Sequence, residues 1–561
     1  MATTPPEYEP KPPISDPDTE SDTVDDVNLT TVISHDPSSS DYDGFRPSLT
    51  EIRLSKSSTR TVSRSPTTLL ARLRRRPAIP AFAHPLSHIP TSTSSLVDFD
   101  GPDDPYQPRN WPLGKKILTT LLYGLLAMSA TWASSSYSAG TVQVAEHFGV
   151  DRQVAVLGTS LFLAGFGIGP LMWAPLSEVY GRRLAVFGPM FVGMCFSFGS
   201  ATARDFQTLM LTRFFGGLFL SAPVTNTGGV LGDLFGPKER GVALAGYAMS
   251  VVGGPVLGPI ASAALVAHPT LGWRWTEYLT GILQAGMLLL AITFIDETYP
   301  PTLLVHKARR LRVETGNWAL HARFEEWDVS AAELARKFLV RPVQLLLTPI
   351  CFLVALYASF CYGILYMQLG AIPIIFHEVR GWSPFVATLP FLCIFLGAVL
   401  GCAANVYNQL GYNRAYHAAG DRAVPEQRLP PMMFGSVFFA GGQFIVGWTA
   451  RPDIHWTVPC LGLVMLGGGF FTIFQAALNY LVDTFQLYAA SAVAANTFLR
   501  SCFACAFPLI VTPLYHNLGV GPGSSITGGF ATLLIPVPFV FFLFGKRIRA
   551  RYEWSKASVY D

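Results

Sequence analysis

Residues 154–183 read VAVLGTSLFLAGFGIGPLMWAPLSEVYGRR, and this stretch decides the fold. The part from 154 to 175 carries no charged side chain, and it is long enough to cross a bilayer, which takes a helix of about 20 apolar residues. Glu178, Arg182 and Arg183 follow it directly. An uncharged run that stops at paired basic residues is typical of a membrane-spanning helix whose end lies in the cytoplasm.

The rest of the chain repeats this pattern. Half of its 561 residues are apolar and only 14% are charged, whereas a soluble domain averages about 25% charged residues. The expected spans are 117–137, 154–175, 184–201, 206–231, 242–266 and 278–294, and then 343–375, 385–406, 431–448, 457–482, 489–515 and 528–544. The sequence therefore predicts an all-α membrane protein, with twelve transmembrane helices in two pseudo-symmetric six-helix bundles.

The positions of lysine and arginine predict the orientation. With the amino terminus inside, most basic residues fall in cytoplasmic segments and few in outer loops, so both termini are expected in the cytoplasm. The first hundred residues are rich in Ser, Thr and Pro and lack apolar runs, which predicts disorder. The expected parts are a disordered cytoplasmic tail (1–104), an N-terminal six-helix bundle (105–296), a cytoplasmic central loop (297–342), a C-terminal six-helix bundle (343–545) and a cytoplasmic C-terminal tail (546–561).

Composition and motifs exclude several classes of function. The net charge of +3 is too small to indicate a nucleic-acid partner. All eight cysteines lie inside apolar runs, which predicts neither a disulfide framework nor a metal site. The chain has no phosphate-binding glycine loop and no His-Glu-x-x-His helix. We therefore expect no metal, no cofactor and no enzymatic activity.

One arginine lies inside an expected span. Arg213 falls in the fourth span, where a charged side chain must face a partner or an aqueous cavity, so it is a functional candidate. A structural arginine bonded to carbonyl groups is the alternative. No carboxylate is expected at similar depth, because the acidic residues near the spans fall close to span ends. These residues are Asp233, Asp296, Glu297, Glu378 and Asp483.

Small residues recur at every fourth position of the fifth span. The stripe consists of Gly246, Ser250, Gly254, Gly258 and Ser262, with Pro255 and Pro259 between them. Such a stripe lets a second helix approach very closely. We expect it to pack on the eighth span, where Gly397 and Gly401 offer a matching groove.

Several motifs together resemble the major facilitator superfamily, and specifically its fungal twelve-span drug:proton antiporters. They are the loop segment GPLMWAPLSEVYGRR (169–183), LTRFFGG (211–217), GPVLGP (254–259), DPYQPRNWP (104–112), ETYPPTLL (297–304) and NTFLRS (496–501). The resemblance runs from about residue 104 to the carboxyl terminus and implies the major facilitator fold.

The resemblance also implies roles for individual residues. It gives Glu178, Arg182 and Arg183 a part in gating, although positive-inside anchoring alone would explain the two arginines. It links Arg213 to proton coupling, and Asp233 is a further candidate from its place at a span end. Through the same resemblance, Gly254, Pro255, Gly258 and Pro259 imply antiport. The alternative is that these residues serve only close packing between helices.

Polar and amphipathic residues at bilayer depth are candidates for the wall of a substrate cavity, since lipid offers them no hydrogen bonds. They are Asn226, Tyr357, Tyr362, Tyr366, Gln368, Gln475, Asn479, Asn496 and Arg500. For each one, hydrogen bonding between helices is an equal alternative. Polyamine exporters of this family carry a glutamate where this chain has Gln368-Leu369-Gly370-Ala371. With arginines and no carboxylate at depth, the sequence predicts a neutral or weakly anionic, partly aromatic substrate.

The expected function is therefore export of a small hydrophobic organic compound, a drug, toxin or secondary metabolite, across the plasma membrane. Two bundles would alternate access to a central site, and inward proton flow would drive export by a monomeric protein. A proton-independent facilitator, an importer of a small organic solute and a polyamine exporter are the alternatives.

Overall fold

The computed structural model describes residues 95–326, 336–420 and 422–556, all within one compact unit. The predicted disorder of residues 1–94 lies outside the described residues. The end of the C-terminal tail and part of the central loop lie outside them as well.

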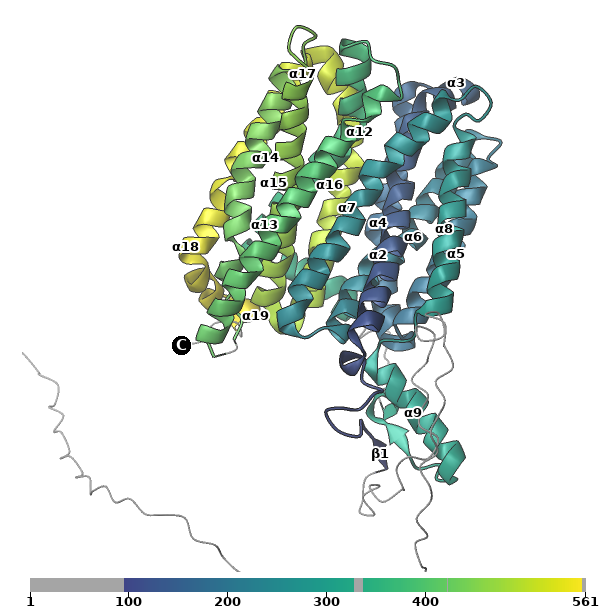
Figure 1. Cartoon of the computed structure of the whole chain (residues 1–561), viewed down its shortest axis with the longest axis vertical. Helices are drawn as coiled ribbons and strands as arrows, with labels where there is room; N and C mark the ends of the chain where they lie inside the picture. Colours follow the sequence, from purple (N-terminus) through teal and green to yellow (C-terminus); the bar gives the residue numbers. More distant parts are fainter. Residues whose placement is uncertain (1–94, 327–335, 421, 557–561) are drawn as a thin grey trace, which may run out of the picture. The chain divides into compact units, whose positions relative to one another are not determined.

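Twelve helices in the described part of the chain are long and apolar enough to cross a membrane (Figure 1). The first bundle contains α2 (Leu113–Ser136), continued by η2 (Tyr137–Gly140) and α3 (Thr141–Phe148), then α4 (Arg152–Tyr180), α5 (Arg182–Ala201), α6 (Phe206–Leu234), α7 (Pro237–Ala267) and α8 (Arg274–Phe294). The second contains α12 (Pro349–Pro373), continued by η5 (Ile374–Val379), then α13 (Phe391–Ala418), α14 (Pro430–Trp448), α15 (Thr457–Phe485), α16 (Ala489–Leu518) and α17 (Val520–Leu534) with α18 (Pro536–Arg551). The predicted all-α, twelve-span fold is confirmed.

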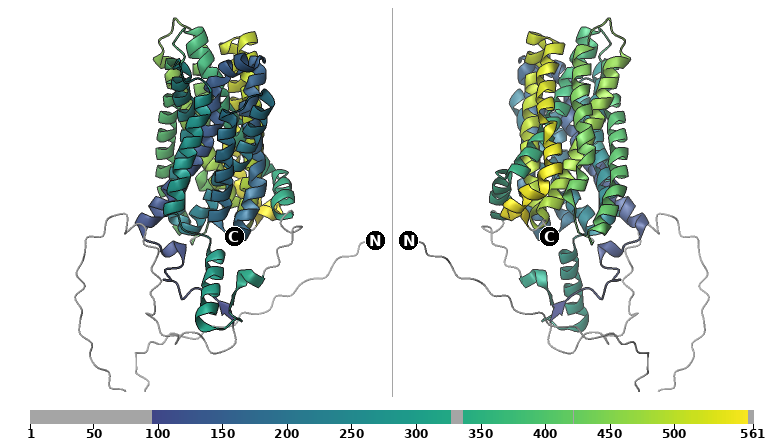
Figure 2. Two further views of the ribbon diagram at one scale, coloured as in Figure 1. Left: turned by 90° about the vertical axis from the view of Figure 1, so that its right-hand side faces the viewer. Right: turned by 90° about the vertical axis from the view of Figure 1, so that its left-hand side faces the viewer.

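Shorter elements complete the described chain. They are β1 (Leu96–Val97), η1 (Pro108–Asn110), α9 (Pro300–Thr315), β2 (His321–Ala322), η3 (Arg323–Glu326), η4 (Arg336–Val340), α11 (Arg341–Leu346), η6 (Val386–Thr388), η7 (Pro425–Arg428), η8 (Gln486–Tyr488) and α19 (Glu553–Lys556). Helix α9, strand β1 and α19 lie at one end of the bundles and α3 lies at the other (Figures 1 and 2). We call these two ends the α9 side and the α3 side.

The ends of several helices follow from their local sequence. Asp151 begins α4 by accepting a hydrogen bond from the backbone N–H of Gln153 at 2.7 Å, and Asp205 begins α6 in the same way with Thr208 at 2.8 Å. Gly181 separates α4 from α5 with a φ of +89°, which an L side chain rarely adopts. The start of α5 is therefore fixed directly beside the charged loop.

The two bundles meet along two pairs of helices, α4 with α16 and α7 with α13. At the α3 side, Arg152 of α4 pairs with Glu378 of η5, with 3.0 Å between Nη1 and Oε1. Near the middle of α4, a Cβ on Gly167 would stand 2.5 Å from the Cβ of Ser501 in α16. The bundles are thus in tight contact from the middle of this helix pair towards the α3 side.

The small-residue stripe packs on a different helix from the one expected. A Cβ on Gly254 would stand 2.6 Å from the backbone nitrogen of Trp132, so the stripe of α7 lies against α2 of its own bundle. Gly397 and Gly401 likewise approach Val464 and Gly468 of α15. The expectation that the fifth span uses its glycines to pack on the eighth is therefore wrong. Backbone-to-backbone approach occurs here inside each bundle, whereas α7 and α13 touch through side chains.

A small module on the α9 side corrects the expected boundary of the disordered tail. Strand β1 pairs in parallel with β2, with Leu96 opposite His321 and Val97 opposite Ala322. Its apolar core consists of Val97, Val305, Ala308, Leu320 and Ala322. The prediction of disorder as far as residue 104 is wrong for residues 95–104, because the apolar partners of this segment come from α9 and β2, far away in the sequence.

Candidate functional site

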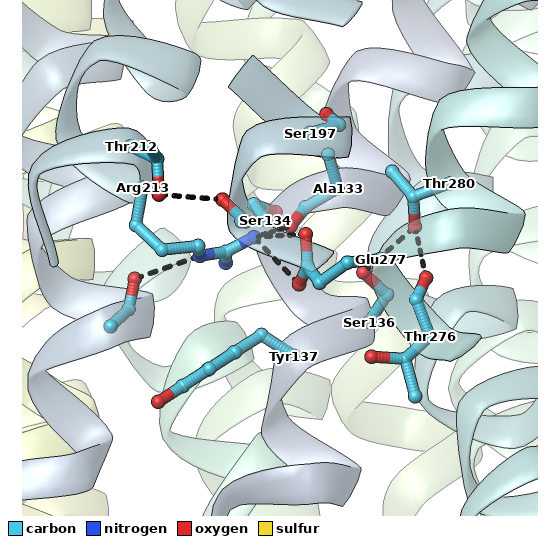
Figure 3. A network of polar contacts seen from close by, with 12 residues as sticks. Ala133, Ser134, Ser136, Tyr137, Ser197, Thr212, Arg213, Thr276, Glu277 and Thr280 are labelled. Atoms are coloured by element: carbon cyan, nitrogen blue, oxygen red, sulfur yellow. Dashed lines mark hydrogen bonds and ion pairs between the residues drawn. The ribbon is translucent and has the colours of Figure 1, made fainter. Parts of the chain in front are cut away.

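Among the residues that the structure describes, the most deeply buried ion pair joins Arg213 of α6 to Glu277 of α8 (Figure 3). The Arg213 Nη1 atom lies 3.2 Å from Oε1 and 3.5 Å from Oε2 of the carboxylate. Only 2% of the Arg213 side chain and 1% of the Glu277 side chain are exposed. A buried charge without a partner costs several kcal/mol, so each of these groups requires the other or an equivalent partner.

Further contacts hold the Arg213 guanidinium in place. Its Nε donates to the Gly158 carbonyl at 3.2 Å and its Nη1 to the Ala133 carbonyl at 2.8 Å. The rings of Tyr137 and Phe162 lie 4.8 Å and 4.7 Å from its central carbon. These contacts come from α2, η2 and α4, so one side chain connects most of the first bundle (Figure 3).

Glu277 corrects the expectation that no carboxylate lies at the depth of Arg213. The sixth span was expected to begin at residue 278, whereas α8 begins at Arg274 and places Glu277 in its first turn. The sequence could have indicated this earlier helix start, because the positive end of the helix dipole favours a carboxylate such as Glu277 in the first turn.

The charged loop after α4 is anchored on the α9 side of the first bundle. The Arg182 Nε lies 3.1 Å from Oδ2 of Asp233, near the end of α6. The backbone N–H groups of Arg182 and Arg183 each donate to the Glu297 carboxylate at 3.0 Å. A Cβ on Gly181 would stand 2.7 Å from that carboxylate, which leaves room for glycine only. These bonds join the ends of α5, α6 and α8 within the first bundle. The gating role expected for Glu178, Arg182 and Arg183, which would involve both bundles, stays a prediction.

The second bundle has a corresponding arrangement that the sequence analysis missed. Arg428, just before α14, places its Nε 2.8 Å from Oδ2 of Asp483 near the end of α15. The hydroxyl of Tyr412 donates to the same oxygen at 2.9 Å. In both bundles an arginine at the start of the third span thus pairs with an aspartate at the end of the fourth.

Between the bundles, aromatic rings surround Arg500 of α16. Its central carbon lies 4.5 Å from the ring centre of Tyr362 and 5.1 Å from that of Phe474. Tyr366, one turn along α12, lies 5.1 Å from Tyr362, centre to centre. The Tyr366 hydroxyl is 2.8 Å from the Ser134 hydroxyl of α2, so the first bundle reaches this cluster.

Two polar groups in this region lack hydrogen-bond partners among the described residues. Asn496 is fully buried, and neither its amide nitrogen nor its amide oxygen is bonded. The Nε of Arg500, one helical turn further along α16, is also unbonded. Buried polar groups in native proteins normally have partners, so these atoms indicate a place for water or for a bound ligand.

The structure gathers only some of the predicted cavity residues. Tyr362, Tyr366, Asn496 and Arg500 come together, with Phe470 and Phe474 as members that the sequence analysis did not single out. Asn226 instead donates to the Ala185 carbonyl at 3.4 Å, and Gln368 donates to Gln443 at 3.5 Å. Hydrogen bonding between helices, the alternative for each residue, accounts for Asn226, whereas the Oε1 atom of Gln368 has no partner among the described residues. Tyr357 and Gln475 are buried in α12 and α15, and Asn479 of α15 is half-buried.

The fold and this site define a polytopic membrane transporter built from two six-helix bundles around a polar and aromatic centre. Residues 121–508 match the model of the Major Facilitator Superfamily, and the chain belongs to that superfamily, whose members are transporters and not enzymes. It is similar to the Efflux pump bik6 of Gibberella fujikuroi, at 46% identity over 83% of this chain and 96% of the relative. It is also similar to the Citrinin biosynthesis cluster MFS transporter mrr1 of Monascus ruber, at 40% identity over 82% of this chain and 92% of the relative.

Among solved structures, the chain is similar to the proton:xylose symporter XylE bound to 6-bromo-6-deoxy-D-glucose. That likeness has a TM-score of 0.56 and 16% identity, and it covers 77% of this chain and 96% of the other. At this level of identity the likeness concerns the fold alone.

Proposed function

We propose that the protein exports a neutral or weakly anionic, partly aromatic organic compound in exchange for protons. The direction is supported by similarity to proteins named as an efflux pump and as a transporter of a biosynthesis cluster. The substrate class rests on one observation, the buried Arg500 with an unbonded Nε among the rings of Tyr362 and Phe474. A cation beside aromatic faces suits a flat ring that carries a negative or electron-rich group.

The orientation that we propose places the α9 side in the cytoplasm and the protein in the plasma membrane. The α9 side carries Arg182, Arg428 and the basic residues of α9 and α18, in agreement with the positive-inside rule. Both termini would then be cytoplasmic, and a single copy of the chain would form the complete transport path.

Proton exchange is proposed because the first bundle contains a buried carboxylate. Protons cross membranes most readily on ionisable side chains inside the spans, and Glu277 is such a group. A facilitator without proton coupling, or an importer, remains the competing function. These alternatives differ in their response to a collapsed pH gradient and in the direction of net transport.

The test compares two dyes that share a flat xanthene ring system and differ in charge. Cells that make the protein are loaded with anionic fluorescein or with cationic rhodamine 6G, and dye retention is followed with and without a protonophore. Faster loss of fluorescein that the protonophore abolishes is the expected result. Preferential loss of rhodamine 6G would contradict the substrate class, and loss of fluorescein that persists with the protonophore would contradict proton exchange.

A further inference from the structure

The geometry of Glu277 differs from that of a purely structural ion pair. Both of its oxygens face the same Arg213 nitrogen, at 3.2 and 3.5 Å, whereas the strongest guanidinium–carboxylate pairs use two parallel N–H bonds. The second terminal nitrogen of Arg213 has no partner among the described residues. The pair therefore falls short of the tightest geometry available to it.

Arg213 keeps good partners when Glu277 is neutral. Two carbonyl groups and two aromatic faces contact the guanidinium independently of the carboxylate. Protonation of Glu277 would thus remove one partner of the Arg213 guanidinium and leave its other partners in place, so the cation would not be left unpartnered in an apolar environment. Burial favours the neutral acid and Arg213 favours the carboxylate, so a change in their separation would shift the balance between the two forms.

Few other titratable groups face Glu277. Tyr137 of η2 lies against Arg213, and its hydroxyl donates to the Ala155 carbonyl at 2.9 Å. Arg274 of the same helix is directed elsewhere, to the Ala203 carbonyl at 2.9 Å and to His147 at 3.3 Å. The groups contributed near the pair by α2 and α4 are backbone carbonyls, hydroxyls and the Phe162 ring, none of which carries charge.

Glu277 also lies close to the α3 side. It stands three residues after the start of α8, a rise of about 4.5 Å along the helix. The exposed His147 of α3 lies beside Arg274 at that end. A proton from the α3 side thus has a short distance to travel to the carboxylate.

A continuous set of contacts leads from Glu277 to the aromatic cluster. Arg213 donates to the Ala133 carbonyl, and the next residue, Ser134, bonds the Tyr366 hydroxyl of the second bundle at 2.8 Å. Tyr366 is in turn 5.1 Å from the Tyr362 ring that covers Arg500. A shift of Arg213 would therefore act on the part of α2 that touches the other bundle.

From these contacts we infer that Glu277 carries the coupled proton, and that Arg213 transmits its protonation through Ala133 and Ser134 to Tyr366 at the substrate site. The inference rests on the proposed proton-coupled export. It assigns the proton to one carboxylate and gives Arg213 the role of a positioning residue. The carboxylate binds a proton from the α3 side and releases it to the α9 side when Arg213 returns to the carboxylate.

The experiment uses the full chain in liposomes and tritiated fluorescein as the probe. With an acidic interior, proton exit drives fluorescein uptake, opposite to the passive distribution of a weak acid, and protein-free liposomes give the background. At equal pH on both sides, exchange of internal unlabelled for external labelled fluorescein needs no net proton movement. Glu277→Gln should lose gradient-driven uptake to the background level and keep exchange close to the wild-type rate.

Matched variants make the result decisive. Gln284→Leu removes another buried polar group of α8, which accepts from Ser197 at 2.9 Å, and it should keep both activities. Glu277→Gln combined with Arg213→Gln removes both buried charges and should also retain exchange alone. Gradient-driven uptake by Glu277→Gln, or loss of exchange in both the single and the double variant, would overturn the assignment. Absence of gradient-driven uptake in the wild type would instead overturn the proposed proton exchange.

Discussion

Arg428 and Asp483 form an ion pair, with 2.8 Å between Nε and Oδ2, at the place in the second bundle that corresponds to the pair of Arg182 and Asp233 in the first. The loop sequences do not reveal this correspondence. By position in the sequence, Arg414 follows the eighth span as Arg182 follows the second. Arg414 is exposed, so the structural counterpart is Arg428, at the start of the following span.

Loss of Arg428 should destabilise the second bundle. Arg428→Gln leaves Asp483, whose side chain is 14% exposed, without its cation, and we expect a loss of about 1–3 kcal/mol. Arg414→Gln is the matched control and should stay within about 0.5 kcal/mol. Thermal unfolding of the purified protein in detergent measures both. The double variant with Asp483→Asn should recover part of the loss, and equal unfolding temperatures for Arg428→Gln and Arg414→Gln would refute the role of the pair.

Close packing of α7 on α2 can be tested with two glycines of the same helix. Gly254→Ala places a Cβ 2.6 Å from the Trp132 backbone nitrogen, which cannot move without the helix, whereas a Cβ on Gly246 meets nothing within 4 Å. We expect Gly254→Ala to cost about 1–3 kcal/mol and Gly246→Ala to be neutral or slightly stabilising. Detergent unfolding again gives the measurement. Equal unfolding free energies for the two variants would show that α2 and α7 are not in backbone contact.

The spans were predictable because the signal for a membrane helix is local. An uncharged run of sufficient length is read directly from consecutive residues, such as 154–175, and needs no knowledge of what packs on it. The same holds for Arg213, since an arginine inside such a run stands out against its neighbours. Of the central site, the sequence pointed to Tyr362, Tyr366 and Arg500 through polarity and depth alone.

What the sequence could not supply were relations between distant residues. Glu277 was missed because it is the residue directly before the expected start of a span at 278, and its partner lies in another helix. The contact of Gly254 with α2 was missed because a stripe of small residues fits any helix that approaches it. The strand at Leu96 becomes stable only against α9, more than two hundred residues later in the chain.

The module around α9 gives a third prediction. Lys307 donates to the Asp98 carbonyl at 2.9 Å and lies 3.3 Å from the buried Asp104 carboxylate. Lys307→Met should lower the local opening free energy of β1 by about 1–3 kcal/mol and leave transport unchanged. Hydrogen exchange of the β1 amides reports the opening, with Arg309→Met on the exposed face of α9 as the control. Unchanged exchange in Lys307→Met would contradict the anchoring role of this lysine.

The charge preference of the central site should depend on Arg500. Its side chain is buried, its Nε is unbonded, and it lies over the Tyr362 and Phe474 rings, so a bound anion would gain a charge-assisted hydrogen bond there. Such a bond is worth about 1.5–3 kcal/mol, and Arg500→Gln should therefore weaken apparent fluorescein affinity about 10- to 150-fold. Arg500→Lys keeps the charge and should retain much of the affinity. The concentration dependence of dye export measures these effects, with rhodamine 6G as the cationic comparison. Because the cationic dye gains nothing from Arg500, an equal loss for both dyes would mean that this arginine supports the bundle and does not select the substrate.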